Sequence, residues 1–104
     1  MAFVTESEFA QHVNSTFQVK LDTDQIVQLE LTDVKTYAHK DEEGERPGLE
    51  RFSLYFRGPN DAFLPQQLYA LSHDKLGELE IFLVPIAQDA SGFRYEAVFN
   101  FWTD

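Results

Sequence analysis

The chain has 104 residues, no cysteine, and 18 acidic against 8 basic side chains, which gives a formal charge of −10 at pH 7. This length is typical of one domain, and the lack of cysteine excludes a disulfide framework and a thiolate zinc site. The acidic balance argues against binding to nucleic acid or to an anionic membrane surface, because both need clustered lysine and arginine.

The N-terminal segment is acidic and has no long apolar run. We therefore expect neither a signal peptide nor a transmembrane segment, and a cytoplasmic location. A short helix is predicted over residues 5–13, because Thr5 can cap its start and Glu8 stands where a capping box needs it. Phe9 and Val13 share the apolar face of this helix.

A β-hairpin is predicted after the helix. Apolar and polar side chains alternate over residues 16–21 and again over 26–37, with a short turn between the two runs. Asp22 and Asp24 lie in that turn, where aspartate is common without any metal. Asp33 interrupts the second run and predicts a bulge or bend.

The longest irregular segment, residues 38–49, is charged and contains glycine and proline. We expect it to be a mobile surface loop. Its acidic part, residues 41–45, offers oxygen ligands but lacks the ligand spacing of an EF-hand calcium loop. We interpret this part as a solvated loop without a metal.

The second half of the chain consists of apolar and aromatic runs bounded by turn-forming residues. The runs at 50–57, 67–72, 76–85 and 94–101 are typical of antiparallel strands. The third of these runs becomes apolar on both faces from Ile81 onward, which predicts that its second half is covered on both sides, with the helix as the cover. Pro85 places the end of that strand at an edge or a bulge.

These elements predict a mainly β fold with about six to eight antiparallel strands, arranged as a partly closed barrel or a two-sheet sandwich. The short N-terminal helix is expected to cover one opening or face. The predicted core consists of inward-facing apolar side chains: Phe9, Val13, Phe17, Val19, Leu29, Leu31, Phe52, Leu54, Phe56, Leu71, Leu79, Ile81, Leu83, Tyr95, Ala97 and Phe99.

Four stretches of the second half carry a family resemblance. They read FSLYFRGP at 52–59, LPQ followed by Tyr69, HD with LG and FLVP at 73–85, and YEAVFN at 95–100. Through them the chain resembles a small bacterial domain family of unknown function. The resemblance implies a stand-alone small protein, in some members associated with phage-tail-like or other surface assemblies. It implies no activity and no site residues.

Two groups of residues raise the question of catalysis or metal binding. Ser72, His73 and Asp74 are the residue types of a hydrolase triad, but neighbouring strand residues point to opposite faces and cannot converge. We interpret them as a strand end and a turn. His12 and His39 complete the set of three histidines, and no two stand at a metal-binding spacing. We therefore expect no catalytic residues, no metal and no cofactor.

Arg57 closes a very apolar strand in a chain with few cations. Two interpretations are open. Its planar guanidinium can clamp a carboxylate or another anion of a ligand or partner. Alternatively it forms a structural ion pair across neighbouring strands, with Glu96 or Glu80 as the expected partner, and structural pairs are the commoner arrangement.

Three aromatic residues are candidates for partner binding. Tyr69 follows the Leu-Pro-Gln segment at 64–66, which we expect to be an exposed loop. Phe101 and Trp102, near the C-terminus, can anchor an interface, since aromatic residues are enriched there. They can equally pack over one end of the barrel.

The function expected from these features is a non-catalytic module for protein interaction or assembly, docking through an aromatic or edge-strand surface. A terminal edge strand can also pair two copies into a homodimer. The alternative is a carrier that holds a small apolar ligand inside the barrel, with Arg57 at its mouth. An enzyme of unknown type comes third, and it needs His73 or Tyr69 to meet a carboxylate in a deep cleft.

Overall fold

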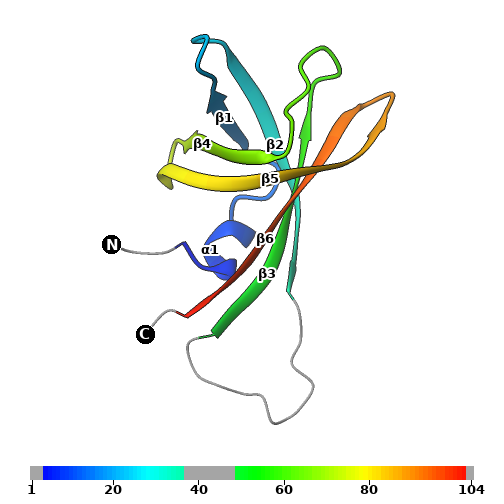
Figure 1. Ribbon diagram of the computed structural model, residues 1–104. Coiled ribbons are helices and arrows are strands. Elements are labelled where there is room, and N and C mark those ends of the chain that lie inside the picture. Colours follow the sequence, from blue (N-terminus) through cyan, green and yellow to red (C-terminus); the bar gives the residue numbers. More distant parts are fainter. Residues whose placement is uncertain (1–3, 37–48, 103–104) are drawn as a thin grey trace.

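The computed structural model describes the backbone of residues 4–36 and 49–102 and the side chains of residues 4–36 and 51–99. Within these ranges one short helix precedes six antiparallel strands in a single ring-like sheet (Figure 1). The elements are α1 (Glu6–Ala10), β1 (Thr16–Lys20), β2 (Ile26–Thr36), β3 (Leu49–Gly58), β4 (Gln67–His73), β5 (Gly77–Asp89) and β6 (Gly92–Trp102). The predicted fold class, mainly β with one short N-terminal helix, is confirmed.

The strand order around the ring is β1-β2-β3-β6-β5-β4, and the ring closes where β1 pairs with β4. Two pairs form that closing ladder, Gln18–Ser72 and Val19–Leu71. Of the arrangements that the sequence left open, the structure therefore has one sheet that closes on itself. The C-terminal strand β6 lies between β3 and β5, so the described residues contain no terminal edge strand of the expected kind.

The strand β5 changes its neighbour along its length. Residues 77–83 pair with β4, whereas residues 84–89 pair with β6, and Figure 1 shows the first part of β5 diverging from β6. A register shift directly after Pro85 confirms a bulge there, but the prediction that the strand ends at Pro85 is wrong, because β5 continues to Asp89. A second shift, immediately before Asp33 in β2, confirms the other predicted bulge. Bulges bend a strand and increase its twist, which helps a sheet of so few strands to close.

The helix α1 is shorter than the predicted span of 5–13. Its start is as expected: the backbone N–H of Thr5 donates to Glu8 Oε1 at 2.9 Å, and the Thr5 side chain accepts from the backbone of Glu8, which completes a capping box. It ends at Ala10, and a tertiary contact then redirects the chain. Asn14 adopts a left-handed φ of 78° and its N–H donates to the carbonyl of Leu31 in β2 at 2.7 Å, so the chain turns into β1 instead of continuing the helix.

An aromatic cluster joins α1 to the sheet. Phe9, from the helix, lies with its ring centroid 6.5 Å from Phe17, 5.9 Å from Phe52 and 5.7 Å from Phe99. The helix packs against β2 and β3. It thus places one large buried ring among side chains from three strands, which is what the sequence predicted of a helix that covers an opening or face.

The interior of the ring is filled by apolar and aromatic side chains. Every predicted core residue is buried except for three that are half-buried and pack against the core: Val13, Leu79 and Phe99. Three further residues are buried that the predicted set omitted: Val27, Leu64 and Tyr69. Val27 follows the alternation of β2, Leu64 comes from the segment expected to be an exposed loop, and Tyr69 follows the alternation of β4.

One prediction about β5 is wrong. The apolar run from Ile81 to Val84 does not mark a strand covered on both sides, because Phe82 points outward and is 47 % exposed. The helix contacts β2 and β3 and leaves the outer face of β5 uncovered. The outward side chains of this run therefore form an apolar outer surface. Only the inward side chains of β5 pack in the core.

Candidate functional site

The side chain of Arg57 forms an ion pair with Glu30, its register partner on β2. The pair matches the structural interpretation in kind but not in partner. Glu96 instead accepts hydrogen bonds from the hydroxyls of Ser53 and Tyr55, each at 3.1 Å. Both members of the Arg57–Glu30 pair are partly exposed, so the pair contributes no more than about 1 kcal/mol.

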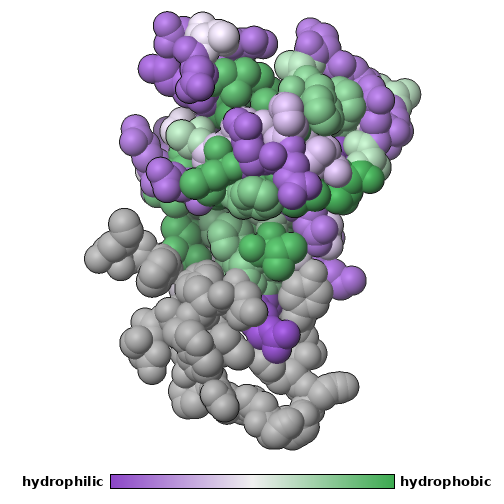
Figure 2. Space-filling model, viewed as in Figure 1, coloured by the Kyte–Doolittle hydropathy of each residue, from purple (hydrophilic) through white to green (hydrophobic). Residues whose placement is uncertain are grey.

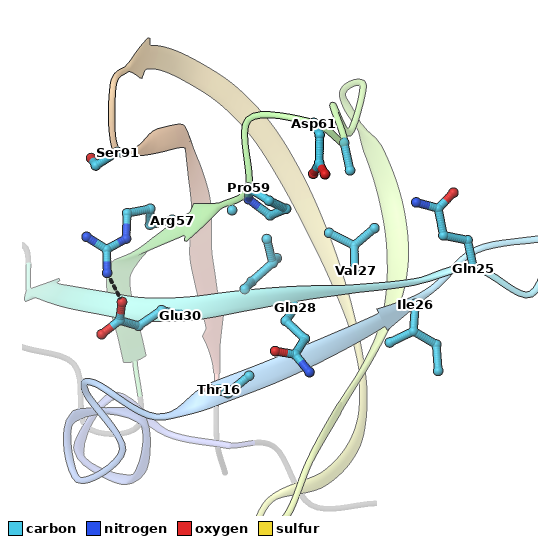
Figure 3. Close-up of a pocket in the computed structure, with 13 residues that line it drawn as sticks. Thr16, Gln25, Ile26, Val27, Gln28, Glu30, Arg57, Pro59, Asp61 and Ser91 are labelled. Carbon is cyan, nitrogen blue, oxygen red and sulfur yellow. Dashed lines mark hydrogen bonds and ion pairs between the residues drawn. The ribbon is translucent and has the colours of Figure 1, made fainter.

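An open cleft of about 570 Å³ lies beside this ion pair. Figure 3 shows Glu30 and Arg57 facing each other at one end of the cleft and Gln25 at the other, with Pro59 and Asp61 along its side. The cleft is lined from β2, the end of β3 and the segment after it. Its polar lining suits a hydrated surface better than an apolar ligand.

Tyr69 is not the exposed contact residue that we expected. It is 4 % exposed, and its hydroxyl donates to the carbonyl of Pro65 at 2.5 Å. Burial raises the pKa of Tyr69, and the nearby Tyr95 adds to that shift. Tyr95 in turn accepts a hydrogen bond from the N–H of Leu64 at 3.0 Å. The two tyrosines thus hold the segment before β4 onto the core. The alternation Tyr69, Leu71, His73 was the signal that Tyr69 faces inward.

The side chains of Phe101 and Trp102 lie outside the described residues. Their backbone belongs to β6, where Phe101 pairs with Glu50 and Trp102 with Leu49 on β3. Their role in partner binding stays a prediction. The segment around His39 and the acidic residues 41–45 lie outside the described range too, as does nearly all of the loop predicted over 38–49.

His73 ends β4 and holds the following turn. Its Nδ1 accepts from the backbone N–H groups of Lys75 at 3.0 Å and Leu76 at 3.1 Å. The ring proton must therefore lie on Nε2, which donates to Ser15 Oγ at 2.9 Å, and that hydroxyl donates to the carbonyl of His12 at 2.5 Å. Burial lowers the pKa of His73, and the neighbouring His12 lowers it further. These bonds use both ring nitrogens of His73 in the structure.

The fold brings two of the histidines together although they are far apart in the sequence. The ring centroids of His12 and His73 are 4.7 Å apart. Two imidazoles alone make an incomplete site, and the described residues contain no group of three histidine, aspartate or glutamate side chains placed to hold a metal ion. The pair therefore packs the junction between the helix and β4.

The outer face of β4 and β5 carries the feature that the sequence interpretation missed. Leu68 and Phe82 are register partners on the two strands, and they are 56 % and 47 % exposed. The next outward pair along the strands is Ala70 with Glu80, both exposed. We call these four residues the outer strip. The exposure of two large apolar side chains directly opposite each other is the strongest candidate for a functional surface.

The space-filling view shows the setting of this strip. In Figure 2 hydrophobic residues gather across the middle of the molecule, over the region where Figure 1 places β4 and β5. Hydrophilic residues are interspersed among them. The face is thus a mixed surface on which apolar and polar side chains lie next to one another.

A family model described as a domain of unknown function, DUF6916, matches residues 4–99. The chain belongs to this family. The matched range begins just before α1 and ends within β6, and it confirms the resemblance to an uncharacterised domain family. No curated protein and no solved structure matched the chain.

In this DUF6916 domain the candidate residues from the sequence do not converge. Arg57, Tyr69 and His73 are each engaged in a separate structural interaction. Among the described residues no helix is long and apolar enough to cross a membrane. What the geometry offers is a surface for contact, at the outer strip, and a polar cleft beside Arg57.

Proposed function

We propose that the protein is a non-catalytic interaction module that docks on another protein through the outer strip. The observation that supports this is the exposure of Leu68 and Phe82, directly opposite each other on adjacent strands. Outward positions of a sheet that faces water carry polar side chains. Burying these two side chains under a partner would remove apolar surface from water, the main favourable term in protein association.

An enzyme is a weaker proposal. Catalysis needs a base and a nucleophile, or paired carboxylates, within hydrogen-bond reach in a cleft. Within the described parts of the chain, both nitrogens of His73 and the hydroxyl of Tyr69 are used by structural hydrogen bonds. Neither candidate lines the cleft beside Arg57.

The alternative of a small apolar-ligand carrier retains one supporting observation, since Arg57 does line an opening. That opening lies beside the sheet, however, and it is lined by Gln25, Gln28, Glu30 and Asp61 among others. The inside of the ring is occupied by buried side chains. Both facts favour docking of a protein over carriage of an apolar molecule.

The proposal includes the wider setting that the sequence suggested. The protein is a bacterial, cytoplasmic module, accessory to a phage-tail-like or surface assembly, and it works without a cofactor. Self-association into a homodimer is a weaker part of the proposal, because β6 already has neighbours on both sides.

A capture experiment tests the proposed function. The tagged protein, the double variant Leu68→Ser with Phe82→Ser, and the control Ile26→Ser are used as bait in lysate of the source organism. Ile26 is a good control because it is 54 % exposed and lies on β2, away from the strip. We expect one protein to be captured in near-stoichiometric amount by the wild type and the control, and to be lost with the double variant. Equal capture by all three baits would refute docking through the outer strip.

A further inference from the structure

We infer that the partner of the outer strip is a protein segment that presents a large apolar side chain flanked by lysine or arginine. This inference rests on the proposed function and adds the chemistry of the partner. It follows from the position of Glu80. Glu80 lies opposite Ala70, one outward pair along from Leu68 and Phe82, so a partner that covers those two side chains also approaches the carboxylate.

A second carboxylate lies further along the same face. Glu78 is the register partner of Ser72 and is exposed, as is Glu80. The outward positions of β4 and β5 between Leu68 and Val84 hold these two acids and no base. Negative charge therefore lies at one end of the strip, on Glu80, and just beyond that end, on Glu78.

The two carboxylates are not neutralised within the part of the chain that the structure describes. Its ion pairs are Arg57–Glu30 and Arg94–Asp89, and neither Glu78 nor Glu80 has a hydrogen-bond or ion-pair partner there. Lys20 at the end of β1, Lys75 in the turn after β4 and Arg94 on β6 are the described bases on adjoining elements. None of them pairs with Glu78 or Glu80.

The free-energy cost of removing water from Glu80 favours a partner that carries positive charge. A partner that covers Leu68 and Phe82 removes water from Glu80, and an ionised carboxylate that loses water without a compensating charge is costly. A lysine or arginine at the edge of the partner's apolar contact supplies that compensation. Complementary charges at the rim also raise the association rate and exclude acidic competitors.

The same charges disfavour a second copy of this chain as the occupant. A two-fold contact through the strip encloses the Glu80 carboxylates of both copies and supplies no base to either, because such an interface uses the same surface on both subunits. Each copy also carries a formal charge of −10. A basic partner relieves both unfavourable effects, whereas self-association increases them.

Peptide titration tests the inference on the whole protein. The probes are a helical amphipathic peptide of leucine and lysine and two relatives of equal length, in which every lysine is replaced by glutamine or by glutamate. Affinity is measured by calorimetry at low and high salt. We expect the lysine peptide to bind, the glutamine peptide to bind more weakly, and the glutamate peptide not to bind. The advantage of the lysine peptide should shrink at high salt.

Matched variants separate a local effect from the net charge. The double variant Glu78→Gln with Glu80→Gln should weaken lysine-peptide binding about fivefold, the effect of two partly exposed charge pairs. The control Asp22→Asn with Asp24→Asn removes the same formal charge from the β1–β2 turn. We expect the control to change affinity much less. Equal weakening by both double variants would overturn the inference, because attraction would then come from the overall charge.

The apolar variant distinguishes this failure from failure of the proposed function. Leu68→Ser with Phe82→Ser should weaken binding of the lysine and glutamine peptides roughly tenfold, because these side chains form the apolar centre. If that loss is seen while the Glu78 and Glu80 variant binds as the wild type does, docking at the strip stands and the basic partner is wrong. If neither variant affects binding, both proposals fail. Thermal unfolding of each variant checks that it is folded.

Discussion

At the scale of single residues, His73 is the best example of a polar group made structural by its surroundings. The ring is 8 % exposed, and its two nitrogens join the turn after β4 to Ser15 and, through it, to His12. A proton on Nδ1 would face two backbone N–H donors and would break this arrangement. The imidazole therefore has to stay neutral for the turn and the junction with β1 to form as described.

This arrangement predicts a pH dependence of stability. Burial lowers the pKa of His73 in the folded protein below the ordinary histidine value of 6.5, so the unfolded chain binds more protons than the folded one once the pH falls below about 6.5. The contribution of His73 to the free energy of unfolding is fully present above that pH. It is lost as the pH falls toward the lowered pKa of the folded state, by at most about 1.4 kcal/mol per pH unit. Urea unfolding at pH values between about 7.5 and 5 measures this loss of stability. Most carboxylates have pKa values below this range and stay ionised across it.

The variant His73→Asn isolates this contribution. An asparagine oxygen can accept from the backbone N–H groups of Lys75 and Leu76 in place of Nδ1, and it does not titrate. We expect the variant to be less stable than the wild type at neutral pH and to lose less stability on acidification. An identical pH profile for both proteins would show that another group is responsible.

At the scale of elements, α1 contributes through one side chain more than through its length. It spans Glu6–Ala10, too short to be stable alone, and its capping box and the packing of Phe9 hold it. Phe9→Ala should lower the free energy of unfolding by about 3–5 kcal/mol, because it empties a site among Phe17, Phe52 and Phe99. The control Gln11→Ala, at the exposed C-cap of α1, should cost less than about 0.5 kcal/mol. Chemical denaturation compares them, and similar small losses in both would contradict the role of Phe9.

At the scale of the whole molecule, the ring is closed unevenly. The β3–β6 ladder is continuous from Leu49 to Gly58, whereas β1 and β4 pair only through Gln18–Ser72 and Val19–Leu71. Local opening follows the weakest set of interactions. The closing ladder is therefore where the sheet should open first.

Hydrogen exchange tests that expectation. Amides in the β3–β6 ladder should exchange most slowly, at rates close to that of global unfolding. The amides that join β1 to β4 should exchange faster. Acidification toward pH 5.5 should widen the difference, after correction for intrinsic exchange rates, because His73 links the end of β4 to Ser15. Equal protection of both ladders would mean that the ring opens only as a unit.

The sequence by itself determined the local structure. Alternation and turn residues located all six strands within a few residues, and Asp33 and Pro85 marked the two bulges. The capping box of Thr5 and Glu8 located the start of the helix. These features depend on backbone preferences and on side-chain period, which are properties of neighbouring residues and are therefore readable along the chain.

The tertiary structure decided what depends on distant neighbours. The partner of Arg57 is Glu30 because β2 lies beside β3, and no local pattern states which strands are adjacent. Leu64 is buried because Tyr69 and Tyr95 hold the segment before β4 onto the core. Phe82 is exposed because α1 packs against β2 and β3. An apolar side chain has the same sequence signature whether its own fold or another protein covers it, so the outer strip became visible only once the ring had closed.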